Sequence, residues 1–90
     1  MNTHLVESFG ITVRRLREGR GWSQEQLAGH ADLNRSYVGE IERGQVIVSL
    51  VTIQKLSGAL GLSAGMLMLQ SEQLGSSRAA IAIDLMAIAC

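Results

Sequence analysis

The sequence predicts an all-helical fold, a compact five-helix domain with an additional C-terminal helix. Apolar residues recur at steps of three and four along most of the chain, which is the period of amphipathic helices. The 90 residues contain no proline, and residues suited to helix ends separate the apolar stretches from one another. A chain of this length forms one domain with a small core.

The first two helices follow from one apolar stripe and one capping pattern. Ser23, with Gln26 three residues later, fits a capping box and predicts a short second helix over residues 24–31. The first helix ends near the glycines at 19 and 21. Its stripe, at steps of four, four and three, consists of Leu5, Phe9, Val13 and Leu16.

A tight turn is expected between the second and third helices. Asp32 tolerates left-handed backbone better than most residues, and Asn34 is a preferred N-cap. The third helix then spans residues 35–43, with Val38 and Ile41 facing inward.

The rest of the chain predicts two further helices, a linker and an apolar tail. Ser49 and Ser63 are N-cap candidates, and the fourth helix ends near Gly61. Residues 71–77 are polar and predict a linker, so we divide the chain into a helix-bearing domain over 1–70 and a linker with an apolar helix over 71–90. The apolar residues of the fourth helix are Leu50, Ile53, Leu56 and Leu60.

Two short helices joined by a turn between residues 24 and 43 have the features of a helix-turn-helix. Small residues such as Ala28 and Ala31 permit two helices to cross closely at roughly 90–120°. The second helix then projects its polar N-terminal half from the surface. A B-DNA major groove about 12 Å wide admits such a helix.

Three segments resemble the lambda-repressor-like, XRE-type helix-turn-helix family: RRLREGRGWSQEQLA, ADLNRSYVGEIERG and SLVTIQKLSGALGLS. The resemblance covers residues 10–69. Restriction-modification controller proteins and small phage or antitoxin regulators are the members nearest in size, and these residues do not choose between them. The resemblance implies a DNA-binding regulator.

The resemblance implies a set of four residues that face the bases. Arg35, Ser36 and Glu40 match base-reading positions, and Tyr37 matches a position that contacts either a base or a phosphate. Arg35 is suited to a bidentate contact with guanine and Glu40 to accepting from cytosine N4, each contributing about 1–3 kcal/mol of discrimination.

The resemblance also implies phosphate contacts and one structural ion pair. Gln24 would hold a phosphate at the start of the second helix, where backbone amides assist, while Arg43 and Gln45 follow the DNA backbone at the far end of the third helix. Arg17 and Glu42 match a partly buried ion pair that ties the first helix to the end of the third.

The loop after the third helix contains three β-branched residues, Val46, Ile47 and Val48, where the family commonly has polar and basic residues. An isolated strand is disfavoured because no second strand candidate exists. One or two of the three side chains can fill the core, and the remainder would be an exposed partner surface. The predicted subunit-interface residues are Val46, Ile47, Val48, Leu67, Ile81, Leu85 and Ile88.

Composition limits the ligands, cofactors and cellular location that we expect for this protein. The formal net charge is zero, which argues against indiscriminate binding of polyanions. Cys90 is the only cysteine, so neither an internal disulfide nor a Cys-rich metal site is expected. The sequence shows no secretory leader and no apolar run of about 18 residues. We therefore expect a cytoplasmic protein with no cofactor, no metal and no membrane contact.

The sequence-based hypothesis is a homodimeric transcriptional regulator that binds a short pseudo-palindromic site in double-stranded DNA. The alternative is an antitoxin-like interaction subunit whose apolar tail binds a partner protein. An enzyme is not expected, because the sequence shows no paired carboxylates in a plausible cleft, no Cys/His/acid arrangement and no phosphate-binding glycine loop after a strand.

Overall fold

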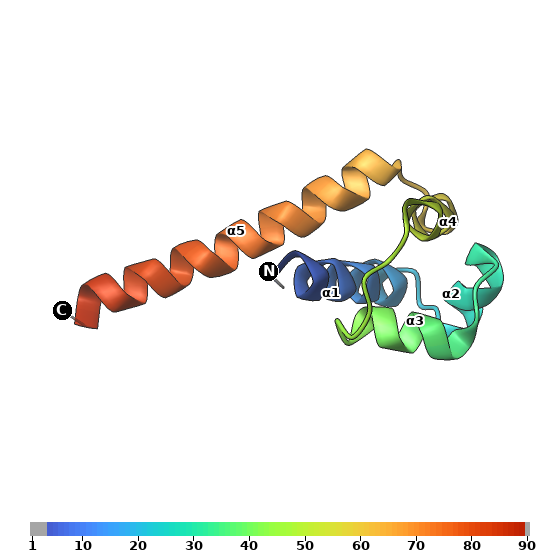
Figure 1. Cartoon of the computed structure of the whole chain (residues 1–90), viewed down its shortest axis with the longest axis horizontal. Helices are drawn as coiled ribbons and strands as arrows, with labels where there is room; N and C mark the ends of the chain where they lie inside the picture. The colour runs from blue at the N-terminus through green and yellow to red at the C-terminus, as the bar shows by residue number, and fades with distance from the viewer. Residues whose placement is uncertain (1–3, 90) are drawn as a thin grey trace.

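The computed structural model describes the backbone of residues 4–89 and the side chains of residues 4–76, and within these residues it contains helices and no strand. The all-helical prediction is confirmed (Figure 1). The five helices are α1 His4–Gly19, α2 Gln24–Ala31, α3 Arg35–Glu42, α4 Leu50–Leu60 and α5 Ala64–Ala89.

The helices begin at the capping residues that the sequence indicates. Ser23 Oγ accepts from the backbone N–H of Gln26 at 3.1 Å, and the Gln26 side chain accepts in return from the backbone N–H of Ser23 at 2.8 Å. Ser49 and Ser63 accept in the same way from backbone N–H groups three residues on. Because each cap satisfies an orphan donor within its own turn, these starts follow from local sequence.

The predicted linker over residues 71–77 is wrong, because this segment belongs to the continuous helix α5. Its polar residues do not interrupt the helix: Ser71 is fully buried and its hydroxyl donates to the Leu67 carbonyl at 2.8 Å. Gly75 brings α5 close to α1, since an added Cβ would lie 3.2 Å from Ser8 Oγ. Packing against α1 therefore extends beyond residue 70.

The core forms between all five helices, and it changes one sequence prediction. Leu67 is fully buried, so its assignment to a subunit interface is wrong. Leu50, unlike the other apolar residues predicted for the fourth helix, is 84% exposed. Leu50 is the first residue of α4, and a helical side chain leans toward the N-terminus, here past the end of the helix. The buried apolar residues are Phe9, Val13, Leu27, Ala28, Ala31, Val38, Ile41, Ile53, Leu56, Leu60 and Leu67.

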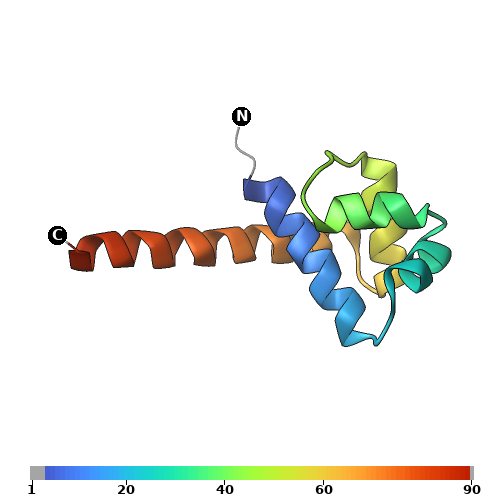
Figure 2. The same cartoon turned by 90° about the horizontal axis from the view of Figure 1, so that it is seen from below.

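The second half of α5 leaves the other four helices in both views (Figures 1 and 2). The side chains of Ile81, Leu85 and Ile88 lie outside the described residues, so their predicted interface role stays a prediction. Within the described part of the chain, no single helix is long and apolar enough to cross a membrane. Only α4 and Ala64–Ser76 taken together, across a 95° bend, meet that criterion.

Candidate nucleic-acid interface

The helices α2 and α3 form a helix-turn-helix with a buried interior. Leu27 and Val38 are fully buried between them. Asp32 occupies the turn with φ 54°, in the left-handed region, as the sequence predicted. Asn34 then caps α3, its side chain accepting from the backbone N–H of Ser36 at 2.7 Å. The interior contacts and the two turn residues together set the direction of α3.

The N-terminal half of α3 presents polar side chains to solvent. Arg35 and Ser36 are exposed, while Glu40 is half-buried. Tyr37 is also half-buried, and its hydroxyl lies 3.3 Å from Thr52 Oγ1 of α4, within hydrogen-bonding distance. Arg35 and Ser36 are thus the side chains of the predicted set that are most available to a ligand.

A shallow depression, which we call the α3 depression, brings most of the predicted DNA-contacting residues together. It combines the exposed turn of α3 with the start of α2. The residues lining it are Gln24, Arg35, Ser36, Gly39, Glu40 and Arg43.

A buried carboxylate joins the three N-terminal helices. Arg17 donates to both carboxylate oxygens of Glu42, at 2.7 and 2.9 Å, and also to the backbone carbonyl of Trp22 at 2.8 Å. Gln24 donates to the same carboxylate at 3.1 Å. The hydrogen bond to Glu42 raises the pKa of Arg17. The expected ion pair is therefore present, and it holds the side-chain amide of Gln24, for which the resemblance implied a phosphate contact.

Arg43 folds back along α3 toward Gly39. Its Nε donates to the Gln45 side chain at 3.2 Å. A Cβ at position 39 would lie 3.0 Å from Arg43 Nη1 and 3.4 Å from Gln24 Oε1. Gly39 was not predicted as a functional residue, although an isolated glycine inside a helical pattern indicates a packing or functional reason.

The loop after α3 both fills the core and leaves one side chain exposed. Val46 and Val48 are half-buried against the core, whereas Ile47 is 71% exposed. Of the three interpretations of this loop, filling of the core by two of its valines with one residue left over is confirmed. The structure contains no strand within residues 4–89.

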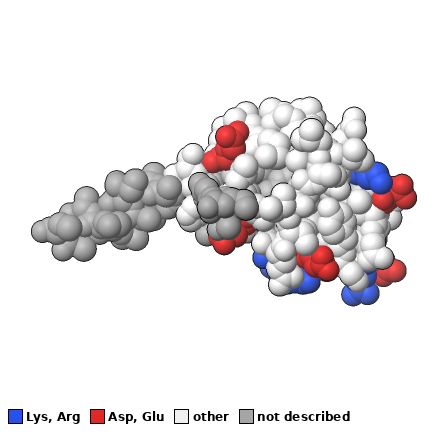
Figure 3. All heavy atoms as spheres, viewed as in Figure 1, with Lys and Arg blue, Asp and Glu red and all other residues white. Residues whose placement is uncertain are grey.

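Ile47 belongs to a wider apolar surface. Two neighbouring depressions share Ile53 and Met68, one lined by residues of α1 and the loop and the other by residues of α4 and α5. Figure 3 shows no charged side chain at the top of the globular part, over the start of α5. We call the exposed members of this surface the apolar patch: Leu5, Ile47, Leu50 and Val51.

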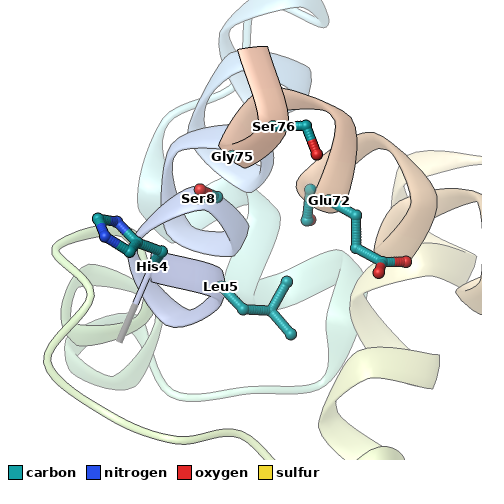
Figure 4. A pocket seen from close by; sticks show the side chains of 7 residues that line it. His4, Leu5, Ser8, Glu72, Gly75 and Ser76 are labelled. Atoms are coloured by element: carbon teal, nitrogen blue, oxygen red, sulfur yellow. The ribbon is translucent and has the colours of Figure 1, made fainter. Parts of the chain in front are cut away.

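A further depression lies where α5 crosses the start of α1 (Figure 4). His4 and Glu72 at its rim point away from each other. Ser8 Oγ is buried beneath it and has no hydrogen-bond partner within the described part of the chain. In the residues searched, no three His, Cys, Asp or Glu side chains are grouped to hold a metal ion. This depression is a close helix crossing.

A helix-turn-helix family profile matches residues 13–67, more than half of the chain. The chain belongs to the helix-turn-helix family, in its XRE-type branch. The matched residues contain all of α2, α3 and α4, together with every residue that lines the α3 depression.

The helix-turn-helix relatives include named regulators. The chain is 49% identical over 63 residues to control protein C.BamHI from Bacillus amyloliquefaciens, across 69% of this chain and 78% of that protein. It is 39% identical over 65 residues to a hypothetical transcription factor from Neisseria meningitidis serogroup B, across 72% of this chain and 61% of that protein. The chain therefore spans less than two thirds of the Neisseria protein.

Two solved helix-turn-helix structures have the same fold. The restriction-modification controller protein C.AhdI from Aeromonas hydrophila is 52% identical, with a TM-score of 0.66 over 70% of this chain and 94% of that chain. The clp gene regulator ClgR from Corynebacterium glutamicum is 27% identical, with a TM-score of 0.83 over 93% of this chain and 88% of that chain. The likeness to ClgR extends into the long helix α5.

Proposed function

We propose that this helix-turn-helix protein is a sequence-specific transcriptional regulator of the restriction-modification controller type, which binds a short pseudo-palindromic operator as a homodimer. The observation that carries the proposal is the exposed turn at Arg35 and Ser36, oriented by the buried helix-turn-helix. The control and controller proteins among its relatives, at 49% and 52% identity, support it. Because its ligand is genomic, plasmid or phage DNA, the regulator acts in the cytoplasm.

Base recognition is assigned to the exposed part of α3. The Arg35 guanidinium provides two parallel donors that match guanine O6 and N7, and Ser36 beside it can donate or accept. Glu40 accepts from cytosine N4. Tyr37 is assigned a contact with DNA from the edge of this surface. Its hydroxyl faces Thr52 of α4.

Phosphate contacts are assigned to the start of α2 and to the loop after α3. The first backbone N–H groups of α2 have no partner within the helix, so the chain around Gln24 offers donors and a favourable dipole to an anion. Gln45 is exposed and reaches the DNA backbone beyond α3. Few cationic side chains take part, so we expect modest phosphate affinity.

The homodimer is assigned to the apolar patch. Exposed apolar surfaces of this kind mark interaction sites, and Leu50 and Ile47 are 84% and 71% exposed within it. A second copy of the chain is the proposed occupant, because a twofold operator requires two α3 helices about 34 Å apart.

The apolar sequence of residues 78–90 favours a second candidate function. Residues 78–89 continue α5 away from the other helices, and the segment is apolar at nearly every position. An antitoxin-like role, with the tail bound to a partner protein, would use it. Removal of residues 77–90 separates the two candidates, because a regulator that dimerises through the apolar patch keeps its operator affinity.

Selection of duplexes from a random pool by the purified full-length protein tests the proposal. The expected result is an enriched sequence with dyad symmetry and half-sites about 10 base pairs apart, centre to centre. Arg35→Ala should lose the preference at one position of each half-site and weaken binding by roughly 5- to 150-fold per half-site. If no duplex is enriched, or if Arg35→Ala selects the same sequence with the same affinity, the proposal is wrong.

A further inference from the structure

We infer that Gly39 is a specificity-determining residue, because the missing side chain lets the Arg43 guanidinium lie in the α3 depression and contact a G·C base pair together with Glu40. The inference rests on the proposed DNA-binding function. It gives Arg43 a different role from the phosphate contact that the family resemblance implied.

The steric part of the argument concerns one turn of α3. Arg43 stands four residues after Gly39, so both lie on the same side of the helix. A Cβ at position 39 would lie only 3.0 Å from Arg43 Nη1, which is closer than most side chains approach. Alanine therefore displaces the guanidinium by a few tenths of an ångström, and a larger side chain would displace it further.

The conformation of Arg43 leaves its ends free for a ligand. Its Nε donates to the Gln45 side chain at 3.2 Å. Both Nη groups lack an acceptor among the described residues. Arg43 folds back over Gly39 and lines the α3 depression.

The chemistry of the depression matches a base pair better than a phosphate. Glu40 lines it beside Arg43, and no described residue forms an ion pair with either of them. A carboxylate repels a phosphate at the same place. A G·C pair suits both side chains, since guanine O6 and N7 accept from arginine and cytosine N4 donates to a carboxylate.

The test measures binding of the full-length protein to the selected operator and to duplexes with each base pair replaced. The variants are Gly39→Ala, Arg43→Ala and the double variant. Gly58→Ala is the matched control, because it also adds a methyl group to a helical glycine and its Cβ has no neighbour within 4 Å. Thermal unfolding by circular dichroism checks that each variant is folded.

Gly39→Ala and Arg43→Ala should each weaken operator binding about 10-fold and lose discrimination at the same G·C pair. The double variant should bind no more weakly than Arg43→Ala alone, and Gly58→Ala should bind like the unaltered protein. Gly39→Ala should unfold at the same temperature or higher, since alanine favours a helix over glycine.

Two results would overturn the inference while leaving the proposed function standing. The first is that Gly39→Ala binds the operator with unaltered affinity and specificity. The second is that Arg43→Ala weakens binding to all duplexes equally and reduces the slope of the salt dependence by about 0.9 per half-site, as loss of a phosphate contact would. If the unaltered protein enriches no duplex, the proposed function and this inference are both wrong.

Discussion

At the scale of single residues, Glu42 is the side chain on which the orientation of the DNA-binding helix most depends. It is the last residue of α3, and it accepts from Arg17 of α1 and from Gln24 of α2. The side chains of Arg17 and Glu42 are only 11% and 2% exposed. One buried carboxylate thus connects three helices, and its loss would leave a buried guanidinium without its counter-charge.

Glu42→Gln is expected to lower the free energy of unfolding by about 3 kcal/mol, because breaking one side of a buried pair leaves the other charge uncompensated. Urea denaturation at a fixed protein concentration measures this change. Arg14→Gln is the control: its ion pair with Glu18 is well exposed, and its loss should change stability by less than about 1 kcal/mol. Equal effects of the two substitutions would contradict the structural role of Glu42.

The same ion pair should be insensitive to pH across the neutral range. The pKa of Arg17 is raised by its hydrogen bond to Glu42. Stability that comes from a raised pKa is fully present below the ordinary pKa of the group and is lost only as the pH rises through the shifted value. Both values lie far above neutral pH for arginine, so Arg17 stays charged wherever operator binding is measured.

At the scale of elements, α1 closely approaches the end of α3 at Gly10. A Cβ added at Gly10 would overlap the carbonyl oxygen of Ile41 and lie 2.8 Å from that of Glu42. Both of these neighbours are backbone atoms, which cannot rotate away. Gly10 therefore allows α1 to press against the C-terminal turn of α3, next to the Glu42 carboxylate.

Gly10→Ala should destabilise the protein by about 1–3 kcal/mol, because the added methyl group forces two backbones apart. Gly58→Ala places the same methyl group in open space on α4 and should stabilise the protein by about 0.5–1 kcal/mol. Thermal unfolding of the two variants, measured side by side, gives the comparison. A gain in stability for Gly10→Ala would contradict the close approach of α1 and α3.

At the scale of the whole molecule, the charged groups around α3 are proposed to bind DNA, and the apolar patch is proposed to hold two subunits together. The formal net charge is zero, so attraction to DNA depends on the few cationic groups that the fold places around α3. The apolar patch carries no charged residue and lies on α1, α4 and the loop before α4. A dimer built on this patch would bring two α3 helices to one duplex without using the tail.

Leu50→Asp should convert the dimer to a monomer, because it places a charge in the proposed interface. Leu50 is 84% exposed, so the substitution leaves the fold intact. Light scattering should show the mass reduced by half, and operator binding should weaken with it. Removal of residues 77–90 is the comparison and should keep the dimer; a monomeric truncation together with a dimeric Leu50→Asp would move the interface to the tail.

Local sequence accounts for the capped starts of α2, α3, α4 and α5, for the turn at Asp32, and for the positions of Arg35 and Ser36 on an exposed helical turn. These features depend on interactions within about four residues, so composition and spacing contain them. Family resemblance added the Arg17–Glu42 pair. Helix packing, by contrast, accounts for the burial of Leu67 and for the continuation of α5 through residues 71–77. Both depend on how closely and at what angle distant helices pack, and no local pattern specifies that packing.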